Sequence, residues 1–312
     1  MKPKILFIDT VHPLIKERLE QHGYQCDWLP GKGYPYYESI IGDYTGIVIR
    51  SGITLDRNIL EKGTALKFIA RLGSGLENID VAFAGSRGIR CLNSPEGNRD
   101  AVGEHAVGML LALMNRLLIA DREVRNGIWK REENRGTEIR GKTVAIIGYG
   151  NMGSAFAQRL SGFGCRTIAF DKYKTGFENA WVEEVTMEEV FAEADVVSLH
   201  IPLTGETRYL VEESWIRSFR KPFILINTSR GPVVNTADLT ASLEQDLVTG
   251  AALDVIEYEE SSFEVLQSEN LPAPFQYLKR SDRVLLSPHI AGWTHESKIR
   301  LAEVLVEKIL LL

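Results

Sequence analysis

The chain has 312 residues, of which 44% are hydrophobic and 25% are charged, and its formal net charge at pH 7 is −6. These values are typical of a globular protein that is long enough for two domains with cores of their own. Acidic and basic residues are interspersed without a basic stretch, so we expect no nucleic-acid partner.

No apolar run approaches the ~20 residues that span a bilayer, so we expect no membrane partner. The first residues predict a β-strand rather than a secretory signal, because their apolar run is short. The three cysteines, Cys26, Cys91 and Cys165, have neither metal-ligand nor redox-motif spacing. We therefore expect a cytoplasmic protein with reduced thiols and no metal site.

Short β-type runs alternate with helical stretches along the N-terminal third of the chain. A strand is predicted over residues 5–9, and a helix over 13–22 ends before Gly23, a residue favoured just past a helix. Residues 31–44 are rich in Gly and Tyr and predict a loop. Further strands are predicted over 47–50, 68–71 and 90–92. The alternation predicts a parallel sheet with helices on both faces.

A long helix is predicted over residues 100–126, with Gly103 and Gly108 as interruptions. Apolar residues around 107–113 cover more of its circumference than one core-facing stripe needs, which indicates burial on two sides. A homodimer interface and a central intramolecular helix explain this pattern equally well. His105, which lies in this helix, is expected to be structural.

A second alternating series begins at Thr143. Its predicted strands cover residues 143–147, 166–170, 195–199, 223–227, 249–253 and 284–286. Six strands with helices between them are the full count of a dinucleotide-binding domain. A last helix over 296–310 carries apolar residues at helical spacing, and we expect it to bury them against the N-terminal sheet.

If the last helix returns to the N-terminal sheet, the chain crosses twice between two domains. We expect a discontinuous domain made of residues 1–99 and 290–312. The nucleotide-binding domain is then made of residues 100–289.

The segment 143–153 carries the strongest indication of function. A β-branched apolar strand enters a turn in which Gly148 allows the tight bend, Gly150 lets a pyrophosphate approach the backbone, and Gly153 lets the next helix pack on the strand. Asp171 ends the next strand, where it can accept hydrogen bonds from both ribose hydroxyls and repel a 2′-phosphate. The pattern therefore predicts NAD rather than NADP. A glycine turn used only for packing is the alternative, and the strand, helix and acid at these offsets argue against it.

Three polar residues follow later strands of the series, namely Arg230, Glu259 and His289. Ligands bind outside the carboxyl ends of the strands in such a sheet, so these side chains could converge there. Oxidation of a secondary alcohol removes a hydride from carbon and a proton from oxygen. A neutral imidazole at His289 can take the proton, Glu259 can orient the ring, and Arg230 offers a planar fork to a carboxylate. Each residue alone has an ordinary structural explanation, but the three together predict a dehydrogenase.

These features resemble one family, the D-isomer-specific 2-hydroxyacid dehydrogenases. The resemblance covers essentially the whole chain and is carried by residues 71–80, 93–98, 103–105, 148–153, 200–204, 227–231, 252–255 and 287–292. It implies an α/β protein with a Rossmann NAD-binding domain and a flavodoxin-like substrate-binding domain, both with parallel sheets. It also implies a small 2-hydroxy or 2-keto acid as the partner molecule, and a homodimer, which we expect to form through the 100–126 helix region.

The resemblance further implies roles for individual residues. Arg230, Glu259 and His289 would form the catalytic group. The backbone of Ser74 and Gly75 would receive the substrate carboxylate. The expected cofactor-binding residues are Tyr149, Gly150, Asn151, Met152, Asp171, His200, Pro202, Thr207, Thr228, Ser229, Asp254 and Gly292, with Asp254 at the nicotinamide amide.

Within the family, residues 48–51 and 94–98 resemble the branch that oxidises 3-phosphoglycerate to 3-phosphohydroxypyruvate in serine biosynthesis. Arg50 then matches a phosphate-binding arginine. However, Gly52 stands where some members of this branch have a second Arg, and Glu77 stands where an Asp is usual.

A further departure from the family lies after Glu259, where Glu260-Ser261-Ser262 replaces the usual Pro and a long loop over 260–283 is expected. The alternatives in the family are a glyoxylate/hydroxypyruvate reductase and a D-lactate-type reductase. An alternative of another class is a non-catalytic NAD-sensing regulator, which need not retain a proton-transfer group.

Overall fold

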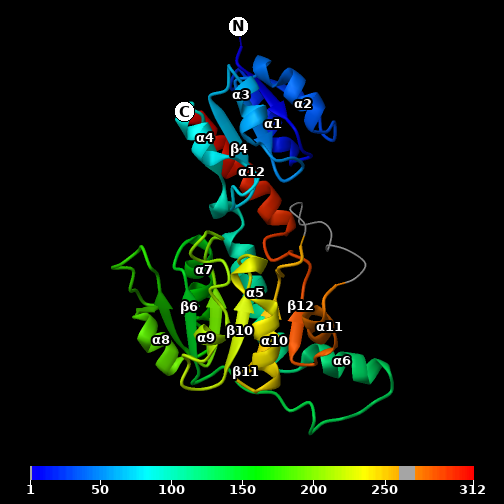
Figure 1. Ribbon diagram of the computed structural model, residues 1–312, viewed down its shortest axis with the longest axis vertical. Helices are drawn as coiled ribbons and strands as arrows, with labels where there is room; N and C mark the ends of the chain where they lie inside the picture. The colour runs from blue at the N-terminus through cyan, green and yellow to red at the C-terminus, as the bar shows by residue number, and fades with distance from the viewer. Residues whose placement is uncertain (1, 260–270) are drawn as a thin grey trace. The chain divides into compact units, whose positions relative to one another are not determined.

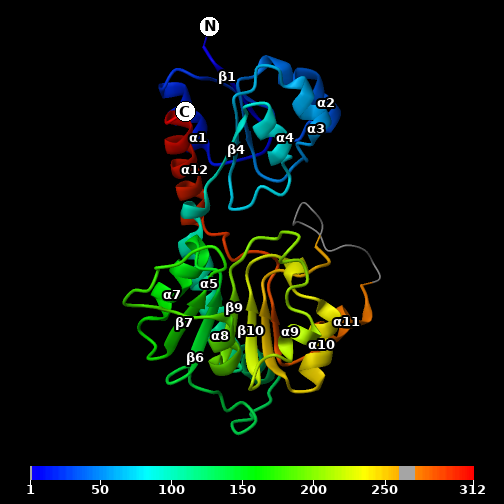
Figure 2. The same cartoon turned by 60° about the vertical axis from the view of Figure 1, so that its left-hand side comes forward.

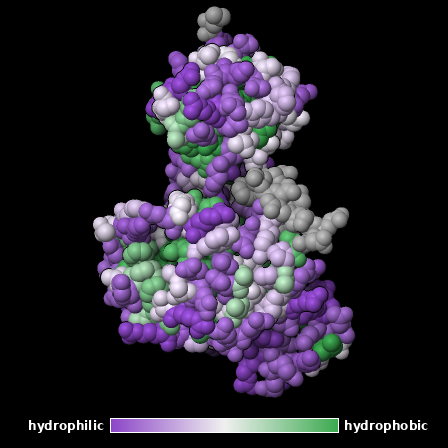
Figure 3. All heavy atoms as spheres, in the orientation of Figure 1, coloured by the Kyte–Doolittle hydropathy of each residue, from purple (hydrophilic) through white to green (hydrophobic). Residues whose placement is uncertain are grey.

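The computed structural model describes residues 2–259 and 271–312, and these form two compact units. The N-terminal unit contains the described residues up to Arg99 together with the segment from Trp293 to Leu312, and the central unit contains the described residues from Asp100 to Gly292. The face of the molecule in Figure 3 is mostly hydrophilic, with small separated apolar areas.

The central unit is built on a seven-stranded parallel sheet, in the order β12-β11-β10-β9-β6-β7-β8 (Figure 1). Its strands are β6 (Thr143–Ile147), β7 (Arg166–Phe170), β8 (Glu183–Glu184), β9 (Val196–Leu199), β10 (Phe223–Asn227), β11 (Val248–Leu253) and β12 (Val284–Leu286). The six predicted strands are confirmed, with ends shifted by at most one residue. The edge strand β8 was not predicted, because two glutamates carry no apolar alternation.

Helices cover both faces of this sheet, as the predicted alternation required. One face packs against α5 (Arg99–Met114) and α7 (Asn151–Leu160). The other packs against α8 (Met187–Glu193), α9 (Glu213–Ile216), α10 (Thr236–Glu244) and α11 (Ala273–Arg280). Two apolar layers therefore hold the strands rigidly, with their carboxyl ends at one edge.

The prediction of one long helix over 100–126 is wrong, because α5 ends at Met114 and a second helix, α6, covers Leu117–Arg125. The two are bent by 61°. Arg116 between them adopts a left-handed backbone with φ of 53°. The carbonyl oxygen of Met114, freed by the break, accepts a hydrogen bond from the backbone N–H of Thr137 at 3.0 Å. Gly103 does not interrupt the helix.

Among the residues that the structure describes, no single helix is long and apolar enough to cross a membrane. The bent pair Pro95–Met114 and Leu117–Arg125 meets the length and composition test only jointly. Much of α5 is buried in the core of the central unit.

The N-terminal unit is a five-stranded parallel sheet in the order β2-β1-β3-β4-β5. Its strands are β1 (Lys4–Phe7), β2 (Gln25–Trp28), β3 (Gly46–Ile49), β4 (Phe68–Arg71) and β5 (Arg90–Asn93). The edge strand β2 was not predicted, since its Gln-Cys-Asp-Trp sequence lacks an apolar pattern. The other four strands are confirmed.

Two layers of helices cover this sheet as well (Figure 2). On one face lie α1 (Pro13–Gln21) and α12 (His295–Leu310), and on the other lie α2 (Tyr34–Ile40), α3 (Arg57–Lys62) and α4 (Val81–Ser86). The predicted docking of the last helix is confirmed, because Ala302, Leu305 and Ile309 are buried in one cluster with residues of β1, β3 and β4.

Two predicted loops contain helices. The predicted loop over 31–44 is wrong, since α2 is followed there by the 3₁₀ turn Ile41–Asp43. Tyr37 anchors α2: its buried hydroxyl donates to the carbonyl oxygen of Leu29 at 2.6 Å. In the predicted loop over 260–283, α11 occupies the later part, whereas residues 260–270 lie outside the described residues.

Candidate active site

The glycine turn of the central unit joins β6 to α7. Gly148 has a φ of +92°, and a Cβ there would lie 2.6 Å from the carbonyl oxygen of His200. A Cβ on Gly153 would lie 2.1 Å from the carbonyl oxygen of Gly148, so the helix approaches the strand as closely as a glycine allows. Around Gly150 a Cβ would meet nothing within 4 Å, and no side chain caps the N-terminus of α7 there. This open helix N-terminus fits a pyrophosphate.

Asp171 follows β7, next to the glycine turn. Its Oδ2 accepts a hydrogen bond from the backbone N–H of Tyr149 at 2.8 Å, and its Oδ1 accepts from the N–H groups of Tyr173 and Lys174 at 2.9 and 3.0 Å. The carboxylate therefore ties the end of β7 to the turn after β6. The ribose contact expected of Asp171 stays a prediction.

Two buried polar atoms at the ends of β9 and β10 have no hydrogen-bond partner among the described residues. They are Nδ1 of His200 and Oγ1 of Thr228. Burial lowers the pKa of His200 to about 3, so its ring is neutral. Buried polar atoms are rarely left without partners, so these two atoms, near an open glycine turn, fit the polar edge of a bound NAD.

The other expected cofactor-binding residues lie at the same sheet edge. Thr207 closes the turn after β9 by donating to the carbonyl oxygen of Pro202 at 2.6 Å, and the buried Ser229 donates to Asn227 Oδ1 at 2.7 Å. Tyr149 is buried and stacks on Phe177 with ring centroids 4.6 Å apart. Asn151 and Met152 lie in the first turn of α7, where the carbonyl oxygen of Asn151 accepts from Ser154 Oγ at 3.2 Å, and Gly292 lies at the end of the unit.

Glu259 and His289 form the closest acid–imidazole pair of this edge. Oε2 of Glu259 lies 2.7 Å from Nδ1 of His289, and both side chains are largely shielded from solvent. The second oxygen, Oε1, accepts from the backbone N–H of Ile256 at 2.5 Å, which fixes the carboxylate. With Nδ1 engaged by the acid, the expected role of His289 in proton transfer, which stays a prediction, would use Nε2.

Arg230 lies at the turn after β10. Its Nη1 donates to the carbonyl oxygen of Ser229 at 2.7 Å. The carbonyl oxygen of Arg230 accepts a hydrogen bond from Asn227 Nδ2 at 3.0 Å. The following Gly231 has no room for a Cβ, which would lie 2.0 Å from the carbonyl oxygen of Ile256. This close approach brings the backbone after Arg230 against the segment that leads to Glu259.

Asp254 follows β11 and is only 1% exposed. Its Oδ1 accepts from Ser287 Oγ at 2.6 Å and from the N–H of Ile290 at 2.9 Å, while Oδ2 accepts from the N–H of Ala291 at 2.8 Å. Burial acts to raise its pKa, but hydrogen bonds from His105, Ser287 and the two amides outweigh this and keep the pKa below its ordinary value. The carboxylate therefore clamps the loop of His289, a role that the sequence did not suggest.

The expected substrate-binding residues lie at the carboxyl edge of the N-terminal sheet. Among the described residues, no group accepts a hydrogen bond from the backbone N–H of Ser74 or Gly75, so both can serve an anion. The Arg50 guanidinium stacks on Trp293, with Cζ 4.3 Å from the ring centroid, and Lys298 Nζ lies 5.2 Å from the same centroid. Neither Trp293 nor Lys298 was predicted to matter.

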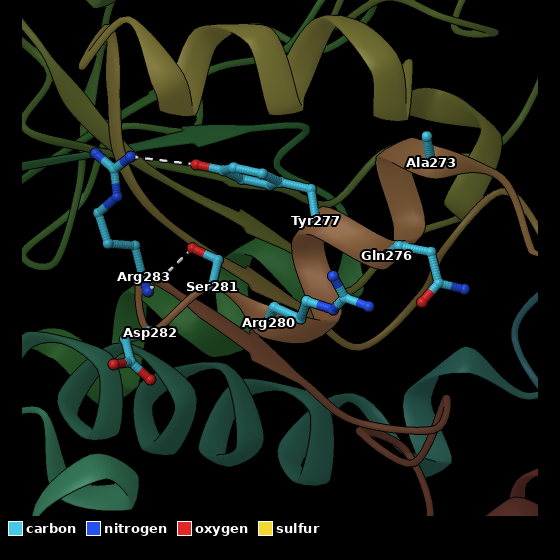
Figure 4. A pocket seen from close by; sticks show the side chains of 7 residues that line it. All are labelled: Ala273, Gln276, Tyr277, Arg280, Ser281, Asp282 and Arg283. Atoms are coloured by element: carbon cyan, nitrogen blue, oxygen red, sulfur yellow. Dashed lines mark hydrogen bonds between the residues drawn. The ribbon is translucent and has the colours of Figure 1, made fainter.

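A hollow of about 770 Å³ on the central unit lies elsewhere (Figure 4). Arg280, Ser281, Asp282 and Arg283, which precede β12, contribute to its wall, and Arg283 points toward Tyr277, with Nη2 3.3 Å from the hydroxyl. These residues enter the amino end of β12, whereas His289 follows its carboxyl end. Because ligands of such sheets bind at the carboxyl ends, the hollow is separate from the candidate site.

Comparison with known proteins places this geometry in a family. Residues 107–291 match the D-isomer specific 2-hydroxyacid dehydrogenase, NAD binding domain family. The chain is 36% identical to a hydroxypyruvate reductase of Thermotoga maritima over 86% of this chain and 85% of that protein. It is 30% identical to a D-3-phosphoglycerate dehydrogenase of Archaeoglobus fulgidus over 98% of this chain but only 56% of that longer protein.

A solved structure shares the fold over nearly the whole length. The D-lactate dehydrogenase of Aquifex aeolicus, solved in complex with NAD and lactic acid, aligns with a TM-score of 0.82 and 26% identity, covering 98% of this chain and 94% of that one. The family model matches more than half of the residues and covers both the glycine turn and the acid–imidazole pair, which are therefore parts of one NAD-binding domain. The chain belongs to the D-isomer-specific 2-hydroxyacid dehydrogenases and is an NAD-dependent enzyme.

Proposed function

We propose that the enzyme interconverts 3-phosphoglycerate and 3-phosphohydroxypyruvate, with His289 as the proton-transfer group. The observation that carries the chemistry is the 2.7 Å contact between Glu259 and His289 at the carboxyl edge of a nucleotide-binding sheet. When bound, NAD accepts the hydride. Residues of this chain bind the substrate and transfer the proton.

His289 Nε2 accepts the hydroxyl proton as the alcohol is oxidised, and it returns the proton in the reverse direction. Glu259 stabilises the imidazolium that results and keeps Nδ1 in place. Arg230 binds the substrate carboxylate through its planar fork and polarises the neighbouring carbonyl. In the N-terminal unit, we assign a role in carboxylate binding to the backbone N–H groups of Ser74 and Gly75, as the family resemblance implies.

The phosphate of the proposed substrate is assigned to Arg50. The guanidinium is oriented by Trp293, and Lys298 adds a second positive charge over the same ring. This second cation offsets the absence of an arginine at Gly52. An unphosphorylated substrate, with a neutral hydroxyl at C3, would not need the positive charges of Arg50 and Lys298.

Hydroxypyruvate is the second candidate substrate, alongside glyoxylate. The specific observation in its favour is sequence identity: this chain is 36% identical to the hydroxypyruvate reductase relative and 30% identical to the phosphoglycerate dehydrogenase relative. Initial rates with NADH on 3-phosphohydroxypyruvate, hydroxypyruvate, glyoxylate and pyruvate decide between them. We expect the highest kcat/KM for 3-phosphohydroxypyruvate. A higher kcat/KM for hydroxypyruvate would make hydroxypyruvate the proposed substrate instead.

The same panel tests catalysis against the alternative of an NAD-sensing regulator. His289→Ala should lose about 10²–10⁴ in kcat, the usual contribution of a positioned acid–base group. Unchanged turnover in His289→Ala would remove the proposed mechanism. No turnover of any keto acid by the unaltered protein, with NADH bound, would favour the regulator.

We also propose that two copies associate through the region of α5 and α6. Apolar side chains remain exposed along it, and the largest fractions are 60% for Leu118 and 77% for Trp129. Leu118→Glu should halve the mass measured by light scattering if this surface is the interface. We place the protein in the cytoplasm, where its three unpaired cysteines stay reduced; burial raises the pKa of Cys26 to about 12.

A further inference from the structure

His289 is held in a backbone conformation that a histidine seldom adopts. Its φ is +54°, in the left-handed region. Its own N–H donates to the carbonyl oxygen of Asp254 at 2.8 Å, and the next two N–H groups, of Ile290 and Ala291, donate to the Asp254 carboxylate. Non-glycine residues keep such a conformation only where their surroundings over-determine it, so the position of His289 depends on Asp254.

A titratable side chain from outside the loop reaches this clamp. His105, on α5, has Nε2 3.1 Å from Ser287 Oγ and 3.5 Å from Asp254 Oδ1. The contact spans 182 positions in the chain. It joins the first helix of the central unit to the loop that carries the proton-transfer group.

The hydrogen-bond inventory fixes the role of each atom. The Ser287 hydroxyl has one hydrogen, and its 2.6 Å distance to the Asp254 carboxylate assigns that hydrogen to Oδ1. Ser287 Oγ then accepts at its 3.1 Å contact with His105, so Nε2 of His105 donates. The result is a directed chain from His105 through Ser287 to Asp254, which strengthens each bond in turn.

We propose that His105 is a positioning residue for proton transfer at His289, acting through Ser287 and Asp254. The inference rests on the proposed role of His289. Without the His105 donor, the Ser287 hydroxyl is free to rotate toward Met109, whose Sδ lies 3.8 Å away. The loop then loses one of the bonds that hold its imidazole at the productive position.

The test compares His105→Leu, which removes the donor, with His105→Gln, whose amide N–H can reach the position of Nε2. Loss of positioning should lower kcat about ten- to a hundredfold in His105→Leu, because small displacements of a reacting group cost that much. The Kd of NADH, measured by fluorescence, should change by less than about twofold, and the solvent isotope effect on kcat should rise as proton transfer slows. His105→Gln should recover most of kcat.

A double-mutant cycle with Ser287→Ala tests the route. If both act through one chain of bonds, the double variant should lose no more kcat than the worse single variant, whereas independent roles would multiply the losses. Glu104→Gln, on an exposed neighbour in α5, is the matched control and should keep wild-type kcat.

Wild-type kcat in His105→Leu would overturn the inference, as would His105→Gln being as impaired as His105→Leu. Multiplicative losses in the cycle would also overturn it. His289→Ala in the same assay separates the two proposals. If His289→Ala is active, the proposed function is contradicted. If His289→Ala is inactive and His105→Leu is fully active, only the proposed role of His105 is contradicted.

Discussion

Replacing Arg50 by alanine isolates the contribution of one cation to substrate choice. The backbone of Arg50 is held independently of its side chain, because its N–H donates to Asp9 Oδ2 at 2.5 Å and its carbonyl oxygen accepts from Arg71 Nε at 3.1 Å. The substitution should therefore leave the end of β3 in place. What it removes is the guanidinium stacked on Trp293.

The expected magnitude follows from comparing a bond to a phosphate with the stacking of the guanidinium on Trp293. Hydrogen bonds to a charged group contribute about 1.5–3 kcal/mol, and ~1.4 kcal/mol corresponds to a factor of ten. A partly exposed cation–π contact is worth only about 0.5–1 kcal/mol. If Arg50 binds a phosphate, kcat/KM for 3-phosphohydroxypyruvate should fall about ten- to a hundredfold, which exceeds the effect of lost stacking.

The assay follows NADH absorbance with 3-phosphohydroxypyruvate and hydroxypyruvate side by side. Only the rate with the phosphorylated substrate should fall in Arg50→Ala, since hydroxypyruvate carries no anion at C3 for a guanidinium to bind. Arg50→Lys is the matched control: it keeps the charge but loses the planar stacking group, so an intermediate loss is expected. Equal losses on both substrates would refute the reasoning and make Arg50 a structural residue.

Three further predictions concern Asp171, Glu259 and His200 in the central unit. Asp171→Asn keeps a hydrogen-bond acceptor for Tyr149 but removes the charge, so the ratio of NADPH to NADH in kcat/KM should rise; an unchanged ratio would count against the NAD assignment of this acid. Glu259→Gln should lower kcat about ten- to a hundredfold with little change in KM, since a charge-assisted bond worth about 1.5–3 kcal/mol is lost, and wild-type kcat would contradict its role. Burial lowers the pKa of His200 from 6.5 to about 3. The unfolded chain therefore takes up a proton that the folded chain excludes between these values, and stability should fall by about 1.4 kcal/mol per pH unit below pH 6.5. Urea unfolding of the wild type and His200→Gln at about pH 7 and about pH 5 measures this, with identical pH slopes as the contrary result.

The fold was largely predictable because burial leaves a local pattern. Strands such as β6 and β10 are buried on both faces and read as unbroken apolar runs, which fixed their ends to within a residue. The polar edge strands β2 and β8 have no such pattern. The bend between α5 and α6 depends on Thr137, which returns from far along the chain to bond the freed end of α5, and no local pattern encodes that contact.

The candidate site divides in the same way. The glycine turn, Glu259 and His289 each follow a strand within a few residues, so strand prediction alone placed them at one edge. The sequence around His105 has no functional motif, so a structural role was expected. Its hydrogen bond to Ser287 forms only because helix α5 packs on the sheet.

Substrate choice is harder to read than reaction type for a physical reason. Hydride transfer from a 2-hydroxy acid needs the same proton-transfer group and carboxylate-binding arginine whatever the rest of the substrate. The residues proposed for these roles, Arg230, Glu259 and His289, follow strands of one sheet within a few positions. In the proposed function, the group at C3 binds at residues that come together only in the folded N-terminal unit: Arg50 at the end of β3, and Trp293 and Lys298 at the start of the segment that forms α12. Because Trp293 contacts both cations, changing this one side chain would move both charges. We therefore expect that specificity can shift between phosphorylated and unphosphorylated acids without a change at Arg230, Glu259 or His289, which is consistent with both reductases and phosphoglycerate dehydrogenases being among the relatives of this chain.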